Sequence, residues 1–116
     1  MSERNETPID REARFSIGDV VHHRTYSFRG VIYDVDPTFN NTDEWWESIP
    51  ERVRPAKDQP YYHLLAENDQ ATYTAYVSEQ NLVRDESDEP CRHPLVDQIF
   101  DGPADGRYRL RVLTSN

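Results

Sequence analysis

The feature of this sequence that most limits its fold is a set of four short runs rich in β-branched and aromatic residues. The runs cover residues 15–21, 31–35, 61–67 and 72–77. Turn residues separate the runs within each pair, with Gly30 closing the first connection and Asn68-Asp69 forming the second. Because this composition favours strands over helices, the sequence predicts two β-hairpins.

A polar link, residues 78–81, separates the second hairpin from Leu82 and Val83. These two apolar residues predict a brief fifth strand. We expect the fifth strand to close the four longer ones into a small twisted barrel, so the predicted fold class is mainly β.

Residues 37–60 form a long connection with several prolines between the two hairpins. A connection of this length is either functional or partly mobile. It contains one predicted short helix, in which Asn41 is the N-cap and Glu44 reaches back to it. Trp45 and Trp46 supply apolar bulk to that helix.

The sequence divides into three parts. Residues 1–13 are mostly charged or small and cannot bury enough surface to offset the entropy of ordering, so they predict a flexible N-terminal arm. Residues 14–84 hold the β-barrel domain, and residues 85–116 form an acidic linker followed by a C-terminal extension.

The C-terminal extension contains two further patterns. Residues 94–100 predict a second short helix with Pro94 at its first position. Residues 107–112 alternate arginine with apolar side chains, which is the period of a strand.

The charge of the chain argues against several classes of partner. It has 13 Lys and Arg residues against 22 Asp and Glu residues, a formal net charge of −9. Such a surface repels polyphosphates and anionic membranes unless its cations are segregated. No apolar run approaches the roughly 20 residues of a spanning helix, and no secretory signal is visible, so we expect a cytoplasmic protein without membrane association.

No arrangement of residues predicts catalysis, a cofactor or a metal ion. His22 and His23 are adjacent, so on a regular strand they point to opposite faces and cannot share an ion. His63 is expected to be partly buried and hydrogen-bonded. Cys91 is the single cysteine, which excludes a disulfide within the chain, and its acidic neighbourhood favours an inert thiol over a nucleophile. We therefore expect a protein that is not an enzyme.

Trp45 and Trp46 are candidates for contact with a partner, because exposed aromatic side chains commonly bind extended peptides or nucleotide bases. The alternative is that they form a lid over the barrel, since a small domain with few Leu and Ile residues must use aromatic side chains as core. The sequence leaves both interpretations open.

Two basic clusters are further candidates for partner binding. Arg107, Arg109 and Arg111 lie on one side of the predicted C-terminal strand. They form either a docking site for an acidic partner or for phosphates, or a charged edge that blocks aggregation between strands. The second cluster, the candidate for nucleic-acid contact, consists of Arg52, Arg54 and Lys57.

The order of motifs resembles the YccV-like, hemimethylated-DNA-binding family, to which the heat shock protein HspQ belongs. The resemblance covers about residues 14–84, and its motifs lie at residues 15–23, 26–37, 59–65 and 76–82. It implies a small SH3-like, strongly bent antiparallel barrel that self-associates as a homo-oligomer.

The resemblance implies two activities. The first is that of a non-enzymatic heat-shock adaptor, a specificity-enhancing factor that binds the Lon protease and promotes degradation of selected substrates. The alternative is a hemimethylated-DNA-binding module that affects the level of the replication initiator. We favour the adaptor, because an acidic chain without a catalytic constellation suits protein docking better than DNA binding.

Overall fold

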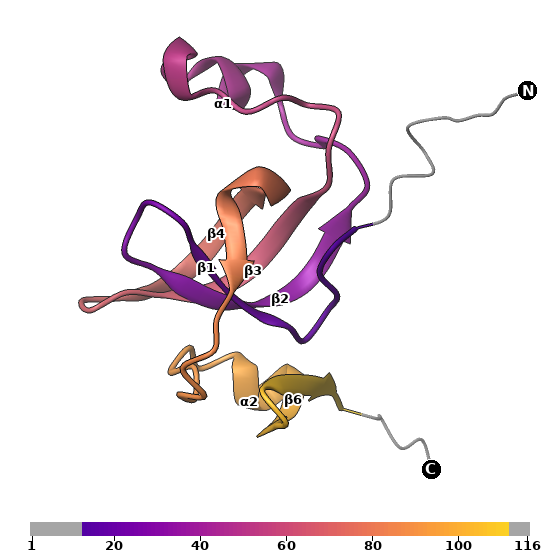
Figure 1. The fold of residues 1–116 in the computed structure, drawn as a ribbon, viewed down its shortest axis with the longest axis vertical. Helices are drawn as coiled ribbons and strands as arrows, with labels where there is room; N and C mark the ends of the chain where they lie inside the picture. Colours follow the sequence, from indigo (N-terminus) through magenta and orange to yellow (C-terminus); the bar gives the residue numbers. More distant parts are fainter. Residues whose placement is uncertain (1–12, 112–116) are drawn as a thin grey trace, which may run out of the picture.

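The computed structural model describes residues 13–111, and its framework is a five-stranded antiparallel sheet in the order β4-β3-β2-β1-β5 (Figure 1). Its strands are β1 (Val20–His23), β2 (Arg29–Asp36), β3 (Tyr61–Glu67), β4 (Thr72–Ser78) and β5 (Leu82–Arg84). A separate hairpin consists of β6 (Phe100–Ala104) and β7 (Arg107–Leu110). The helical elements are α1 (Asp43–Glu47), α2 (Val96–Ile99) and the 3-10 turns η3 (Glu51–Val53) and η4 (Glu79–Asn81).

Both predicted hairpins and the brief fifth strand are confirmed. β1 pairs with β2, β3 pairs with β4, and β5 pairs with β1 rather than with the end of the second hairpin. The mainly β class, the bend of the sheet and the two short helices are confirmed as well.

The closed SH3-like barrel is not found. In the part of the chain that the structure describes, no pairing joins β4 to β5, so the sheet has two edges. η4 turns the chain directly after β4, and β5 then pairs with β1 at the opposite edge of the sheet from β4.

The two predicted helices begin later than expected. Thr42, not Asn41, is the N-cap of α1, and its Oγ1 accepts a hydrogen bond from the backbone N–H of Trp45 at 3.0 Å. Helix α2 begins at Val96 rather than at Pro94. It ends before Phe100, which begins β6.

The register of β2 against β3 shifts once, between Ile32 and Asp34, so Tyr33 is an extra residue on β2. Before the shift, Val31 pairs with Leu65 and Ile32 with Leu64; after it, Asp34 pairs with His63. Because side chains alternate between faces, this bulge moves every later residue of β2 to the opposite face.

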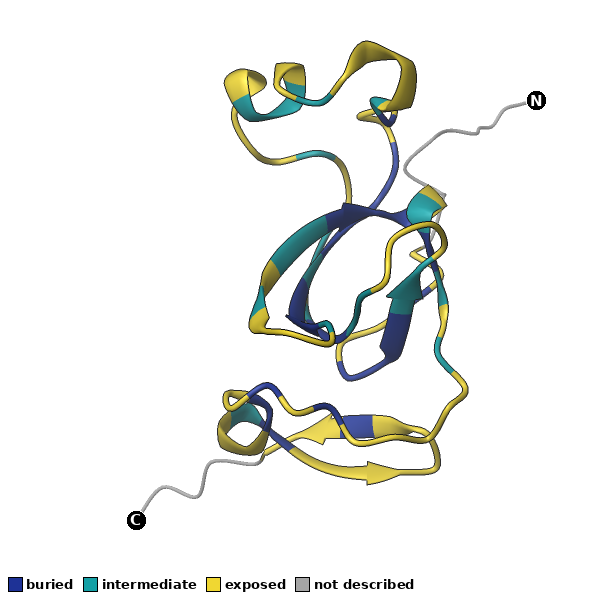
Figure 2. Cartoon of the chain, turned by 90° about the vertical axis from the view of Figure 1, so that its left-hand side faces the viewer, coloured by how far each residue is buried: buried dark blue, intermediate teal, exposed yellow. Residues whose placement is uncertain are grey.

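The sheet is buried on both faces (Figure 2). The inner face of the bend carries one cluster of buried residues, consisting of Phe15, Val21, Ile32, Tyr62, Leu64, Ala66, Val77 and Leu82. The outer face carries a second cluster, in which Val20, Val31 and Leu65 meet Cys91, Val96, Phe100 and Tyr108. Residues beyond position 84 therefore supply part of the core, while the predicted division of the chain at that position stays a prediction.

A network of ion pairs fastens the C-terminal layer, which consists of residues 85–111, to the sheet. Arg29 lies 2.6 Å from Glu67 Oε2 and 2.9 Å from Asp85 Oδ2, and Arg92 Nε lies 2.9 Å from Glu67 Oε1. Burial raises the pKa of Glu67, but the hydrogen bonds that Glu67 accepts from Arg92 and Arg29 outweigh this effect, so the pKa is lowered. The carboxylate is consequently held in its charged form under the layer.

The flexible arm predicted for residues 1–13 falls almost wholly outside the described residues. Between residues 13 and 111 there is no helix of the length and apolar character needed to cross a membrane.

Gly18 generates the first prediction, because it joins the two parts of the fold. Its N–H donates to the Ile32 carbonyl and its carbonyl accepts from the Tyr108 N–H, both at 2.8 Å. Its φ is +96°, and an added Cβ would overlap the Tyr108 carbonyl oxygen. We expect Gly18→Ala to lower the free energy of unfolding by about 3 kcal/mol, measured by urea denaturation.

Gly106→Ala is the matched control for that measurement. Its φ of +78° imposes the same kind of backbone strain, but a Cβ there would lie 3.7 Å from the nearest atom. We expect a loss of only about 1 kcal/mol. Equal losses in the two variants would show that close packing against Tyr108 is not what position 18 requires.

Candidate partner-binding groove

A groove of about 370 Å³ lies along β4, between the β1–β2 loop and the insertion formed by residues 37–60. His23, at the end of β1, and the loop residues Thr25, Tyr26 and Phe28 line one side of it. The insertion supplies Trp45, Ile49, Val53 and Pro55, and strands β3 and β4 with η4 supply Tyr61, Tyr73, Ala75, Tyr76, Val77, Ser78 and Asn81. We refer to this surface as the β4 groove.

Stacked aromatic rings connect the insertion to the sheet at the β4 groove. The Tyr61 and Tyr76 rings stack with centroids 5.2 Å apart, and Phe39 meets Tyr61 edge-on at 5.3 Å. Trp45 packs on this group, 5.9 Å from Phe39 and 5.5 Å from Tyr76. Burial raises the pKa of Tyr61 to about 12, so its hydroxyl stays protonated and donates to the Ala56 carbonyl.

Trp45 thus packs on the sheet, as expected of a lid, and also lines the β4 groove, as expected of a residue that contacts a partner. Trp46 has different surroundings. Its ring lies beneath the Arg54 guanidinium at 4.7 Å and the Lys57 ammonium at 4.4 Å, and its Nε1–H donates to the Pro55 carbonyl.

The insertion holds its own shape through contacts at its neck and around its helix. The Phe39 N–H donates to the Lys57 carbonyl at 3.0 Å, which brings the two ends of the insertion together. Arg54 donates to the carbonyls of Ile49 and Glu47. Arg54 and Lys57 therefore serve the internal structure of the insertion, whereas Arg52 is exposed.

The lining of the β4 groove contains no carboxylate, although the chain as a whole carries a net charge of −9. Its polar side-chain groups are hydroxyls, an amide, the Trp45 indole N–H and the His23 ring. Strand β4 is also an edge of the sheet, paired within residues 13–111 only with β3. An aromatic wall beside an unpaired strand edge is suited to an extended polypeptide, which can use both side-chain pockets and backbone hydrogen bonds.

The predicted C-terminal arginines lie elsewhere. Figures 1 and 2 place the β6–β7 hairpin and the insertion at opposite ends of the molecule. Arg107 lies 3.1 Å from Asp19 Oδ1, and Arg111 lies 2.7 Å from Asp101 Oδ1. Arg109 is exposed on the same hairpin. The structure therefore separates the predicted partner-binding residues into two surfaces.

His63 is half-buried and hydrogen-bonded, as the sequence predicted, with its Nε2 lying 2.9 Å from Asp36 Oδ2. Cys91 is buried in the outer core, and burial raises the pKa of its thiol. A thiol with a raised pKa is a poor nucleophile, which agrees with the interpretation of an inert cysteine.

Sequence reasoning missed the β1–β2 loop as one wall of the β4 groove. The His23 Nδ1 accepts hydrogen bonds from the N–H groups of Thr25 and Tyr26, both at 3.0 Å. The His23 ring also packs on the rings of Tyr26 and Phe28, with centroids 4.6 and 5.2 Å away. We call this arrangement the His23 cap. The sequence signal for it was a histidine directly before a short turn of polar and aromatic residues.

Comparison with known proteins gives one family and a group of longer relatives. The sequence model described as "Hemimethylated DNA-binding protein YccV like" matches residues 13–107. F-box only protein 21 is 32% identical in mouse, and 31% identical in Sumatran orangutan (Pongo abelii) and in human, over 91 residues. The match covers 78% of this chain and 14% of each relative, so this chain spans a small part of the length of these curated relatives.

The His23 cap gives a pH-dependent prediction. Burial, with a smaller effect from Arg24, lowers the pKa of His23 below its usual 6.5. The stability that the cap contributes is therefore complete above pH 6.5 and is lost as the pH falls through the lowered pKa. We expect an NMR titration to give a His23 pKa below 6.5.

Hydrogen exchange provides the structural readout. Protonated His23 has no lone pair on Nδ1, so the protection factors of the Thr25 and Tyr26 amides should fall below that pKa. Protection that stays constant through the titration would contradict the assignment of His23 as the cap of this loop.

Proposed function

Because this chain belongs to the YccV-like family, we propose that it is a non-enzymatic heat-shock adaptor that binds the Lon protease and promotes degradation of selected substrates. The family is one of binding modules without known catalytic activity. The observation that carries the proposal is the β4 groove, an aromatic surface free of carboxylates at an open edge of the sheet. An unfolded segment of a substrate or of the protease is the kind of chain that such a surface accommodates.

The groove has exposed apolar side chains that an incoming polypeptide would cover. Tyr26 on the β1–β2 loop is 61% exposed and Val53 on the insertion is 51% exposed. The two residues stand on opposite walls of the β4 groove, with the edge of β4 between them. Burying both on binding would remove apolar surface from water, which is the main source of affinity in protein docking.

The C-terminal arginines supply a second contact in this proposal. Arg109 extends from β7, between the ion pairs that Arg107 and Arg111 form with Asp19 and Asp101. An adaptor needs two surfaces, one for the protease and one for the substrate, and the insertion and the β6–β7 hairpin lie at opposite ends of the molecule (Figure 1). The expected homo-oligomer and cytoplasmic location stay predictions.

The adaptor proposal is tested by incubating the full chain with the cognate Lon, ATP and a model substrate, and following the amounts of substrate and of this chain. We expect the chain to accelerate substrate decay. The double variant Tyr26→Ser, Val53→Ser should lose at least about fivefold of that acceleration, because it removes exposed apolar groups from both walls of the β4 groove.

Leu95→Ser is the matched control, since Leu95 is 38% exposed and lies outside both the β4 groove and the β6–β7 hairpin. Full activity in Leu95→Ser together with loss in the double variant supports the groove as the docking site. Acceleration by the double variant equal to that of the unchanged chain would exclude the groove, and no acceleration by the unchanged chain would exclude the adaptor. Disappearance of this chain alone would make it a substrate of the protease.

A second candidate function is recognition of hemimethylated DNA, which the description of the matched family favours. Trp46 with Arg54 and Lys57 over its ring, and Arg52 exposed nearby, form a basic and aromatic surface on the insertion. Two of these three cations already make contacts within the insertion. With a net charge of −9 the chain would need these few cations to dominate its local field.

Fluorescence anisotropy with hemimethylated and unmethylated duplexes of one sequence distinguishes this function. DNA recognition requires tighter binding of the hemimethylated duplex, affinity that falls steeply with salt, and a smaller salt slope in Arg52→Ala. Under the adaptor proposal we expect no detectable binding of either duplex at physiological salt. Selective binding of the hemimethylated duplex at that salt would make DNA recognition the function of this chain.

A further inference from the structure

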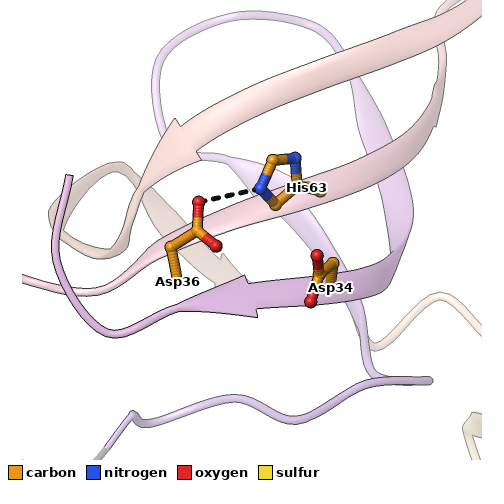
Figure 3. Close-up of side chains that lie close together, drawn as sticks. All are labelled: Asp34, Asp36 and His63. Carbon is orange, nitrogen blue, oxygen red and sulfur yellow. Dashed lines mark hydrogen bonds and ion pairs between the residues drawn. The ribbon is translucent and has the colours of Figure 1, made fainter. Parts of the chain in front are cut away.

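Asp34, Asp36 and His63 bring three metal-ligating groups together on the outer face of the sheet (Figure 3). Asp34 and Asp36 come from the end of β2, and His63 comes from the neighbouring strand β3. Donor atoms from the three side chains all lie within 4.8 Å of one another. The group is separate from the β4 groove, whose lining includes none of these residues.

The β2 bulge creates this arrangement. In a regular strand, Asp34 would share the face of Ile32, which points into the inner core. The extra residue Tyr33 shifts the alternation, so Asp34 lies directly opposite His63 and Val35 takes the inner face. Asp36, two residues after Asp34, shares its face. Bulges commonly re-aim side chains next to functional sites.

The His63 ring is held in place by aromatic neighbours and by Asp36. The Tyr33 and Tyr76 rings lie on it with centroids 5.8 and 4.7 Å away. Its Nε2 is 2.9 Å from Asp36 Oδ2, and the Tyr76 hydroxyl donates to that same oxygen at 2.9 Å. Hydrogen bonds from outside the ligand set orient carboxylate ligands in metal sites, which is the role that the geometry gives Tyr76.

The charge of the group also favours a cation. Asp19 and Glu67 are buried acids that pair with arginines. Among residues 13–111, neither Asp34 nor Asp36 has a lysine or arginine within ion-pair distance, and the basic side chain beside Asp36 is His63. Two carboxylates on one face repel each other unless a proton or a cation neutralises them.

We propose that Asp34, Asp36 and His63 bind a divalent transition-metal ion, of which Zn²⁺ is the best match. One imidazole nitrogen and two carboxylate oxygens suit Zn²⁺ better than Mg²⁺ or Ca²⁺, which favour oxygen ligands alone. Ligand atoms about 2.1 Å from a tetrahedral Zn²⁺ lie about 3.4 Å from one another, so donors that are up to 4.8 Å apart need to close by up to about 1.4 Å. Rotation of the exposed Asp34 side chain supplies such a movement.

The test is isothermal titration of the full chain, without an affinity tag, with ZnCl₂. We expect one Zn²⁺ per chain, and affinity reduced at least about 10-fold in Asp34→Asn and in His63→Gln. Because metal binding to histidine requires its neutral form, affinity should also fall as the pH is lowered. The visible spectrum of bound Co²⁺ gives an independent readout, since its bands should disappear when Zn²⁺ is added.

His22→Gln is the matched control, because His22 also lies near a carboxylate, Asp85, at 3.3 Å, but belongs to no three-residue ligand group among residues 13–111. We expect it to bind Zn²⁺ like the unchanged chain. Asp34 is exposed, so Asp34→Asn keeps the test decisive even if His63→Gln fails to fold. No binding by the unchanged chain, unchanged affinity in Asp34→Asn, or equal affinity for Mg²⁺ would each overturn the proposal.

Discussion

The register of β2 against β3, with its single bulge at Tyr33, is the constraint on which the rest of the structure depends. Ahead of the bulge it directs Val31 toward the outer core and Ile32 toward the inner core. Beyond it, Val35 reaches the inner core, while Asp34 faces His63 on the outer side. A strand without the bulge would bury Asp34 among apolar residues, at a cost of several kcal/mol for an unpaired charge. The extra residue thus keeps Asp34 out of the inner core, while apolar residues of β2 are buried on both faces of the sheet.

Burial of both faces explains where binding surfaces are left. The C-terminal layer covers the outer face at one end, and the insertion covers the aromatic rings at the other. The strip between the insertion, the β1–β2 loop and β4 stays accessible. Most cations near either end are committed to internal contacts, as Arg29 and Arg54 illustrate. The lining of the β4 groove is therefore aromatic and free of carboxylates, which suits a polypeptide better than a polyphosphate.

The sequence was sufficient to predict the elements whose signals are local, and insufficient where tertiary contacts decide. β-branched and aromatic runs with turn residues predicted both hairpins, and Leu82 marked the fifth strand. The N-cap lies one residue later than predicted because Thr42 and Asn41 are both good caps, and Thr42 accepts from the Trp45 N–H while Asn41 accepts from the Thr42 N–H. Barrel closure depended on where η4 turns the chain, which no local pattern encodes.

The candidate sites show the same division. Trp45 was a candidate because aromatic bulk is visible in a sequence, and it lines the groove, whereas the opposite wall of the groove depends on how the His23 cap folds its loop. The group of Asp34, Asp36 and His63 escaped a search for closely spaced ligands. Asp36 and His63 are 27 residues apart in the chain. The bulge in β2 places Asp34 and Asp36 on the same face of the sheet as His63.

The closed neck of the insertion has an evolutionary consequence. The hydrogen bond from the Phe39 N–H to the Lys57 carbonyl joins the two ends of this segment. The insertion is therefore attached to the sheet as a short, fixed connection, regardless of the length of the chain between these two residues. Loop-closure entropy grows only slowly with length, so exposed residues between these two positions that do not contact the sheet can be replaced or lengthened at little cost to stability. One wall of the groove is thereby free to diverge between relatives while the framework stays constant, in the way that antibody loops vary on a conserved scaffold.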